Sequence, residues 1–247
     1  MQGLNYDLHI HSCLSPCADD DMTVNNIVGM AVLNGLRIVA LTDHNSCANC
    51  SSFFEVAIAA GIVPVAGCEL TTAEEIHLLC LFPSLEIAMD FDRVLSAYRM
   101  RFPNRPEIFG EQLILNSQDE VTGKEPFLLP PATALSLTEA HGLVSGCGGA
   151  CLPAHIDRTS NGILAVLGAM PHEPVFPWVE YADHGKREGL EARYPTLRDR
   201  SILCNSDAHH LWDIAEGEHS LSFPDSVTDA DGIRRLLISM LREEERR

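Results

Sequence analysis

The order of apolar and polar positions along the chain predicts strands that alternate with helices. Residues 6–11 alternate with a period of two, which is typical of a short strand, whereas residues 37–41 form the nearly unbroken apolar run of a strand buried on both faces. Similar segments predict five further strands, at residues 62–66, 76–82, 149–155, 175–181 and 201–204. Strands are therefore expected along most of the chain.

Helical spacing of apolar residues fills the intervals between these strands. Thr23 is expected to cap a helix that ends at Gly35, and Ser-Leu-Thr-Glu at residues 136–139 forms a capping-box pattern that opens another. Further helical patterns lie at residues 53–60, 85–101, 163–169 and 230–246. Repeated strand-then-helix units imply parallel strands with right-handed crossovers, hence an α/β sheet or barrel. No linker interrupts the pattern, so residues 1–247 are expected to form a single domain.

The proline-rich stretch at residues 103–131 departs from this rhythm. It contains the turn-like sequence Val121-Thr122-Gly123-Lys124 between short apolar segments. We interpret residues 103–131 as an insertion, with a hairpin flap as its expected form.

Composition and charge narrow the class of protein. The chain has 247 residues, 46% of them hydrophobic, which is enough to bury a core. With 17 Lys and Arg against 35 Asp and Glu, the formal net charge of −18 repels phosphate backbones and anionic lipids. We therefore expect neither a long nucleic acid nor a membrane as a partner. No secretory signal is visible, so a cytoplasmic protein with nine reduced cysteines is expected.

Histidines and carboxylates gather at the ends of the predicted strands. His9 and His11 end the first strand and, being two residues apart, point to the same face. Asp207 and His209 have the same spacing after the strand at 201–204. Single residues of these types mark other strands, namely Asp43, His44, Glu69, His77 and His155. In an α/β barrel such positions converge at the C-terminal rim.

Metal binding explains this group better than isolated structural roles. A lone histidine in a strand is more often a hydrogen-bonded core or surface residue, but many imidazoles and acids in one cavity would repel each other or stay unsatisfied without cations. Imidazole with carboxylate suits Zn, Mn or Fe, and the number of ligands predicts two to three divalent ions bridged by a carboxylate. The other histidines are interpreted as structural or solvated: His141, His172, His184, His210 and His219.

These motifs resemble those of the PHP (polymerase and histidinol phosphatase) superfamily. The resemblance rests on segments that keep the family's order over most of the chain: residues 7–12, 41–45, 67–69, 76–77, 153–155 and 206–209. It implies a distorted (β/α)7 barrel, a TIM-like fold, with up to three metal ions at its rim. It also implies a hydrolase, the metal-dependent phosphoesterase class.

The resemblance further implies how the ligands divide among three sites. The first set would be His9, His11, Glu69 and Asp207, and the second Glu69 (bridging), His77 and His155. The third would combine His44 and His209 with an acid or histidine from the loop after the first strand. That loop departs from the family's common Ser-Asp-Gly form, and both Asp19 and Asp21 remain candidates.

The implied reaction is hydrolysis of a phosphoester by a metal-bound hydroxide that attacks phosphorus in line. Glu69 and Asp207 would serve catalysis through the metals, and the planar fork of Arg158 is a candidate phosphate clamp, with a surface ion pair as the alternative. The expected substrate is a small phosphorylated metabolite or nucleotide, selected by residues 103–131. Two alternatives stay open: a nuclease or 3′-end-processing module, and a non-catalytic, metal-loaded regulatory domain. The oligomeric state is left open as well.

Four cysteines near this rim allow three interpretations. Cys13 and Cys17 lie in the loop after the first strand, and Cys47 and Cys50 follow His44. Together they could hold a structural Zn²⁺ or an Fe–S cluster, or be small buried hydrophobic residues, the commoner role of free cysteine. Cys47 and Cys50 could also act as a redox switch.

Overall fold

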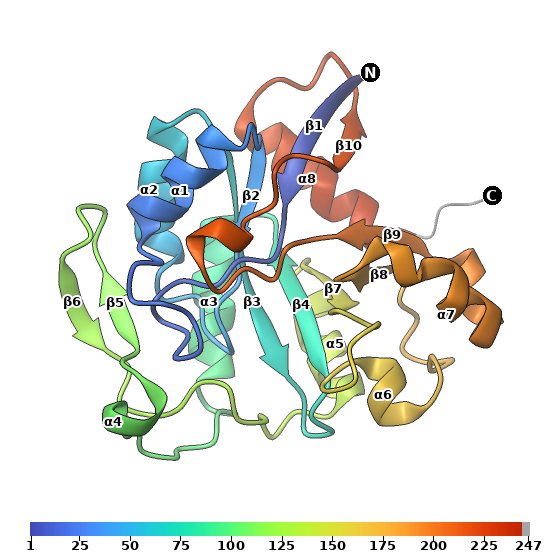
Figure 1. Cartoon of the computed structure of the whole chain (residues 1–247), viewed down its shortest axis with the longest axis horizontal. Helices are drawn as coiled ribbons and strands as arrows, with labels where there is room; N and C mark the ends of the chain where they lie inside the picture. The colour runs from blue at the N-terminus through green and yellow to red at the C-terminus, as the bar shows by residue number, and fades with distance from the viewer. Residues whose placement is uncertain (244–247) are drawn as a thin grey trace.

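The strands form a curled mixed sheet, described by a computed structural model for residues 1–243 (Figure 1). Six strands pair in the order β10–β1–β2–β3–β4–β7. Their bounds are β1 (Gln2–Asp7), β2 (Ile38–Leu41), β3 (Val63–Thr71), β4 (His77–Phe82), β7 (Ala150–Pro153) and β10 (Ser220–Phe223). β1, β2 and β3 run parallel, and β10 runs antiparallel to β1.

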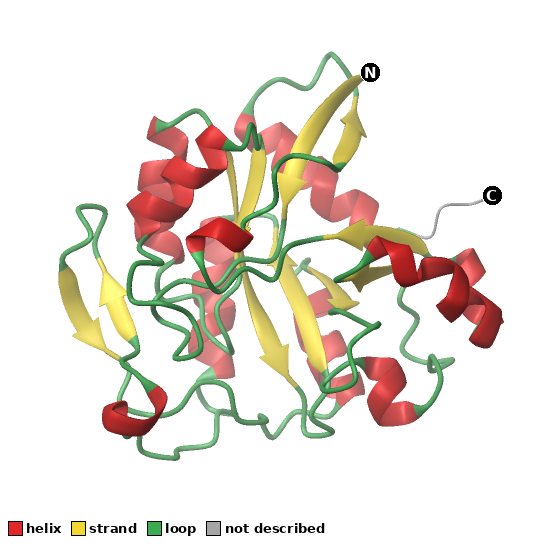
Figure 2. Cartoon of the chain, viewed as in Figure 1, coloured by secondary structure: helices red, strands yellow, loops and turns green. Residues whose placement is uncertain are grey.

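Two further strands continue the curl beyond β7 (Figure 2). β8 (Trp178–Tyr181) and β9 (Ser201–Cys204) form a parallel pair. The chain after β7 joins β8 where the amide of Ile156 donates to the carbonyl of Glu180 (2.9 Å). The chain after β9 returns to β1 through a parallel bridge between Ile10 and Ala208. Segments that follow β1, β7 and β9 are thereby brought to a common rim.

One strand runs against the expected all-parallel arrangement. β4 is antiparallel to both β3 and β7. Only residues 72–76 separate β3 from β4, which leaves no room for the dozen or more residues of a crossover helix. The fold is therefore a mixed α/β half-barrel, and strict strand–helix alternation fails between β3 and β4.

Helices cover the sheet on both faces. The longer ones are α1 (Val24–Leu33), α2 (Cys50–Ala59), α3 (Leu85–Leu95), α5 (Leu137–Gly146) and α8 (Ala230–Arg242); the shorter ones include α6 (Ile163–Leu167) and α7 (Arg187–Arg193). Thr23 caps α1, and the expected capping box opens α5, with reciprocal hydrogen bonds between Ser136 and Glu139. α3 ends at Leu95, earlier than expected. The predicted end of the C-terminal helix, residues 244–246, lies outside the described residues.

Two apolar clusters hold these layers together. On one face of the sheet, α1, α2, α3 and α5 supply residues such as Ile27, Phe53, Phe91 and Val144. On the other face, Leu237 and its neighbours on α8 pack against strand residues that include Val65 and Leu79. Burial on both faces explains the unbroken apolar runs of β2 and β3.

Residues 103–131 form a small unit outside the main sheet, at the left of Figure 1. α4 (Pro106–Phe109) leads into an antiparallel hairpin of β5 (Leu113–Leu115) and β6 (Val121–Lys124). The buried Gln112 amide bridges the hairpin to residues 125–129 with three hydrogen bonds. The expected hairpin is present, and its status as an insertion stays a prediction. No helix within residues 1–243 is both long and apolar enough to cross a membrane.

Candidate metal centre

A single buried carboxylate, Glu69 near the end of β3, lies at the centre of the rim. Its Oε1 is 2.7 Å from His77 Nδ1 and 2.9 Å from His155 Nε2. Its Oε2 is 3.0 Å from His44 Nδ1. Two more imidazole nitrogens lie within 3.5 Å, those of His9 and His11. Five imidazoles from segments far apart in the sequence therefore share one acid, as a bridging ligand requires.

The first expected ligand set is brought together as a cluster. Donor atoms of His9, His11, Glu69 and Asp207 lie within 4.8 Å of one another, and all four residues are buried. Asp207 Oδ1 is 3.3 Å from His9 Nε2 and 3.1 Å from His11 Nε2. Ligands bound tetrahedrally at 2.0–2.1 Å, as on Zn²⁺, lie about 3.3 Å apart. The spacing of these atoms thus fits a shared metal ion.

Two further clusters contain His44. One joins His44, Glu69 and His77, and the other joins His11, His44 and His209. His155 belongs with the former through its contact with Glu69, and its ring lies 5.3 Å from that of His77. The expected partners of the second and third sites are therefore gathered around Glu69 and His44.

Unpaired buried nitrogens test whether this centre suits metal. Nδ1 of His44 and Nδ1 of His155 are buried and lack a hydrogen-bond partner, although His44 Nδ1 faces Glu69. The Nε2 atoms of His9 and His11 face each other at 3.2 Å. Such groups are destabilising unless a cation accepts their lone pairs. The donor set fits divalent metal ions.

The backbone is strained at two of the candidate ligands. His155 has φ +29° and Asp207 has φ +52°, values in the left-handed region that residues with a side chain rarely adopt. Strain of this kind persists where the surrounding structure fixes it, and it gathers at functional sites. The backbone is thus bent at two of the candidate ligands.

The charges of the cluster shift the pKa values in opposite directions. Burial alone would raise the pKa of Glu69, but His77, His9 and His44 hold it well below its usual range. Burial would likewise raise the pKa of Asp207, and His9 and His11 lower it. Both carboxylates are therefore held ionised, the form that binds metal.

The imidazoles divide into two classes. Burial alone would lower the pKa of His11, yet hydrogen bonds to Asp207 and Glu69 raise it to about 9, and acidic neighbours raise that of His9. Burial lowers the pKa of His44, and burial with the neighbouring His11 lowers that of His209 to about 4. Without metal, His9 and His11 are therefore protonated, and their positive charges partly balance the two carboxylates.

Glu180, which the sequence analysis missed, supports the first ligand set from β8. Its oxygens lie 3.0 Å from His9 Nδ1, and it accepts hydrogen bonds from the amide of His155 (2.9 Å) and from Asn205 Nδ2 (2.6 Å). A carboxylate on the second nitrogen of a ligand histidine fixes its tautomer and orientation. The available signal was a charged residue inside the apolar strand Trp178–Tyr181.

A second relay of polar contacts orients His11. Ser15 Oγ lies 3.0 Å from His11 Nδ1 and donates to Asp43 Oδ1 (2.7 Å). Asp43 also accepts from the amide and hydroxyl of Ser12. Asp43 thus acts on an imidazole through a hydroxyl. Asp7 instead accepts hydrogen bonds from backbone amides, those of His9, Ser206 and Ala215.

The loop acids do not enter the clusters. Asp19 Oδ2 pairs with His210 Nδ1 at 2.6 Å, and the Asp19 amide donates to the carbonyl of His209 (3.0 Å). Asp21 contributes its carbonyl to Asn26 rather than its carboxylate to the centre. Within residues 1–243 the cluster around His209 consists of three imidazoles, so the expected contribution of Asp19 or Asp21 is not seen. His210, interpreted as structural or solvated, is the partner of Asp19, and both side chains are partly exposed.

Arg158 lies at the rim with its side chain 43% exposed. Its Nη1 is 2.6 Å from Oδ2 of the buried Asp207. The pair is therefore not an ordinary surface ion pair, because its acid is a candidate metal ligand.

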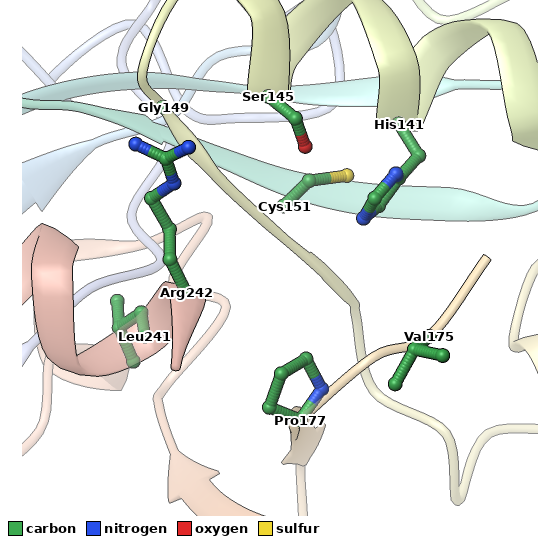
Figure 3. Close-up of a pocket in the computed structure, with 8 residues that line it drawn as sticks. All are labelled: His141, Ser145, Gly149, Cys151, Val175, Pro177, Leu241 and Arg242. Carbon is green, nitrogen blue, oxygen red and sulfur yellow. The ribbon is translucent and has the colours of Figure 1, made fainter. Parts of the chain in front are cut away.

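The cysteines, and the histidines interpreted as structural or solvated, do not belong to the three ligand clusters found among residues 1–243. None of the three clusters among residues 1–243 contains a cysteine. Cys13, Cys47 and Cys50 are buried, and Cys17 is exposed. His141 lines a separate cavity of about 240 Å³ with Cys151 and Arg242, between α5, β7 and α8 (Figure 3). The small buried hydrophobic role of Cys13, Cys47 and Cys50 fits their burial best.

Comparison with known proteins assigns the family. Residues 7–125 match the family model of the PHP domain. This chain carries a PHP domain. The match confirms the resemblance drawn from the motifs, and PHP domains are metal-dependent hydrolases. His155, Asp207 and His209 lie beyond the matched residues and reach the PHP centre only through the curl of the sheet.

The error-prone DNA polymerase of Symbiobacterium thermophilum is 33% identical to this chain over 215 residues. The aligned region covers 82% of this chain and 19% of the polymerase. The chain thus spans about a fifth of the length of this curated relative.

Solved structures share the fold. A protein of Bifidobacterium adolescentis assigned as a metal-dependent phosphoesterase aligns over 94% of this chain and 95% of its own, with TM-score 0.57 and 21% identity. Endonuclease Q, solved with a 27-mer duplex that carries an abasic lesion at the active site, aligns over 85% of this chain and 50% of its own, with TM-score 0.57 and 18% identity. At these identities the likeness establishes the fold alone.

The expected exclusion of long nucleic acid in favour of a small-molecule substrate is wrong. Endonuclease Q, which contains this fold, binds a DNA duplex. The net charge of −18 is a sum over the whole surface, whereas a phosphate responds to the charge around the site that it enters. Metal ions invert that local charge, so an acidic surface elsewhere does not exclude a nucleic-acid strand.

Proposed function

We propose that this PHP domain is a metal-dependent phosphoesterase that cleaves phosphodiester bonds in a nucleic-acid strand. The observation that carries the proposal is the position of Glu69, one ionised carboxylate in contact with five imidazoles. Such a bridge allows two or three divalent ions, Zn, Mn or Fe, to lie close together. A cluster of cations suits a phosphodiester because charge accumulates on its oxygens during hydrolysis.

The residues of the chain have distinct tasks in this proposal. His9, His11, Glu69 and Asp207 would hold one ion, with His44, His77, His155 and His209 completing the others. The metals would supply positive charge to the phosphoryl oxygens and lower the pKa of a water molecule. Arg158 would release part of its contact with Asp207 and place its fork on a phosphate oxygen.

Two exposed arginines that lie over aromatic rings support a nucleic-acid substrate over a small metabolite. Arg101 lies over the ring of Phe127 (5.8 Å) and Arg105 over that of Phe109 (6.0 Å). Neither arginine forms an ion pair within the described part of the chain, and both are exposed. Exposed cations next to aromatic rings are typical of surfaces that bind single strands. These two contacts are local features that the net negative charge of the whole chain does not reveal.

The test is a cleavage assay on defined strands. Protein stripped of metal by a chelator is reloaded with Mn²⁺ and incubated with end-labelled single-stranded DNA, duplex DNA and a duplex with an abasic site. We expect labelled products with the reloaded protein, and none with the chelated protein or with Glu69→Gln. Failure to cut any of the three substrates with Mn²⁺, Zn²⁺ or Fe²⁺ would refute the proposal.

A further inference from the structure

An exposed indole stands at the edge of the metal centre. Trp212, on the short helix η3 (Leu211–Asp213), is 71% exposed, whereas the chain's other tryptophan, Trp178, is 6% exposed. An indole left in water forgoes the stabilisation that burial of a large aromatic surface provides. The position of Trp212 is therefore not explained by packing of the fold.

Neighbouring side chains fix this indole as a platform. Its ring stacks on that of His210, with centroids 4.7 Å apart and planes inclined by 6°. His210 is held by Asp19, whose Oδ2 lies 2.6 Å from Nδ1. The amide of Asp213 donates to the carbonyl of His210 (3.0 Å) and closes the turn. One face of the indole is thus covered, and its high exposure leaves the other face available.

The platform is joined directly to the metal centre. His210 follows His209, whose imidazole forms a cluster with His11 and His44. The Asp19 amide donates to the carbonyl of His209, so the acid that holds the platform is also bonded to the ligand segment. Trp212 is therefore three residues from His209, a candidate ligand, and is held by the same segment and the same loop acid.

We propose that Trp212 is a stacking subsite for a nucleobase next to the phosphodiester at the metal centre. This inference rests on the proposed function and specifies its substrate contact. A single exposed ring whose chain neighbours include the exposed acids Asp213 and Glu216 suits a planar, uncharged base better than an apolar protein partner. Every base offers a π face, so the subsite binds bases without selecting a sequence.

The experiment compares strands with and without bases. Fluorescein-labelled ten-nucleotide strands with uncleavable phosphorothioate linkages are titrated with Mn²⁺-loaded protein, and binding is followed by anisotropy. One strand carries bases, and the other is abasic with the same charge. We expect Trp212→Ala to weaken binding of the first strand about tenfold and to leave the abasic strand unchanged. Trp212→Phe should keep most of the affinity.

Tyr98→Ala is the matched control, because Tyr98 is an exposed aromatic residue that belongs neither to the three ligand clusters nor to the two arginine–aromatic contacts. Equal affinities of wild type and Trp212→Ala for the base-carrying strand would overturn the subsite. So would an equal loss with the abasic strand, or failure of wild type to bind either strand. Trp212-dependent binding without any cleavage would support the subsite and refute only the proposed hydrolysis.

Discussion

β3 carries side chains of types that can bind metal toward both of its faces. Glu69 points to the imidazoles of the metal centre, and the preceding residue, Cys68, points to the opposite face. There Cys68 lies opposite Cys80 on β4, and Cys80 lies opposite Cys151 on β7. One strand therefore takes part in two clusters whose residue types can both bind metal.

Two more thiols extend this row from α2 and the loop before it. The Sγ atoms of Cys47 and Cys50 lie 3.3 and 3.7 Å from the carbonyl oxygen of Gly67. Contact with Cys50 and Cys68, together with burial, raises the pKa of Cys47, and burial raises the pKa of Cys80. We call Cys47, Cys50, Cys68, Cys80 and Cys151 the thiol row.

The difference between the two clusters is charge. A thiol with a raised pKa stays neutral and can be buried as a small hydrophobic group. Ionised carboxylates cannot be buried in this way without compensating cations or hydrogen bonds. The acids and imidazoles converge on common points, whereas no cysteine among residues 1–243 belongs to such a cluster, and the buried acids are ionised while the thiols are neutral.

Replacing Glu69 by Gln should produce the largest effect. The variant keeps the shape of the side chain and removes the charge shared by five imidazoles. We expect loss of bound metal by elemental analysis and at least a ~100-fold fall in phosphodiester hydrolysis. Cys68→Ala, one residue away on the other face, should keep its metal. If Glu69→Gln bound as much metal as wild type, the charge of Glu69 would not be what distinguishes the metal centre from the thiol row.

Glu180→Gln should have a smaller effect on the same cluster. The substitution weakens the contacts that orient His9 and the segment of His155 without removing a ligand. Loss of such a supporting partner lowers metal affinity by about 10–100-fold. Competition with a metal-binding dye measures this change. Glu111→Gln, at an exposed acid paired with Lys124, is the control, and an unchanged affinity in Glu180→Gln would contradict the role assigned to Glu180.

Local pattern and long-range topology contributed differently to what the sequence could predict. The two-residue spacing of His9 and His11 is local, so it was visible without a fold, although β1 ends at Asp7 and both histidines follow it instead of ending the strand as expected. The partnership of Glu180 with His9 joins β8 to β1 and depends on how the sheet curls. The reversal of β4 had a local signal, the five residues between β3 and β4, which are too few for a crossover.

The loop after β1 was beyond prediction for another reason. It has no periodicity, and its conformation is set by bonds to distant segments, such as that from the Asp19 amide to His209. His210 competes for the Asp19 carboxylate, which the count of residues along the loop could not reveal. The acidic residues of this loop therefore could not be assigned as ligands from the sequence.

The metal-free protein should be most stable near pH 6.5. The raised pKa values of His9 and His11 contribute stability below the unfolded value of about 6.5, and it is lost as pH rises through the folded values, about 9 for His11. The lowered pKa values of His44 and His209 reduce the stability of the folded protein below pH 6.5. Below pH 6.5 the unfolded chain binds protons that these folded imidazoles do not, down to about 4 for His209.

Bound metal should abolish the loss of stability above pH 6.5, because metal ions replace the protons on His9 and His11. Melting temperatures measured from pH 4 to 9, with chelator and with Mn²⁺, provide the test. A loss of 1 kcal/mol lowers the melting temperature by roughly 2–4 °C in a chain of this size. A chelated protein as stable at pH 9 as at pH 6.5 would show that the acids at the rim do not hold these protons.

Thiol reactivity should show the smallest effect on the metal centre. Cys17 is exposed and Cys147 is half-buried, so iodoacetamide at pH 7.5 is expected to label these two in the native protein. Cys17 should react more slowly than its exposure suggests, because burial of its sulfur atom and the negative charge of Glu69 raise its pKa to about 12. The thiol row should be protected in the native protein and fully labelled only after denaturation; within the native protein Cys151 should react first, because it lines the cavity in Figure 3. Peptide mass spectrometry counts the labels, and elemental analysis after native labelling should find the metal content unchanged. A row that reacts as fast as Cys147 in the native protein would mean that its thiols are accessible, and burial in a neutral form would no longer separate them from the acids on the other face of β3.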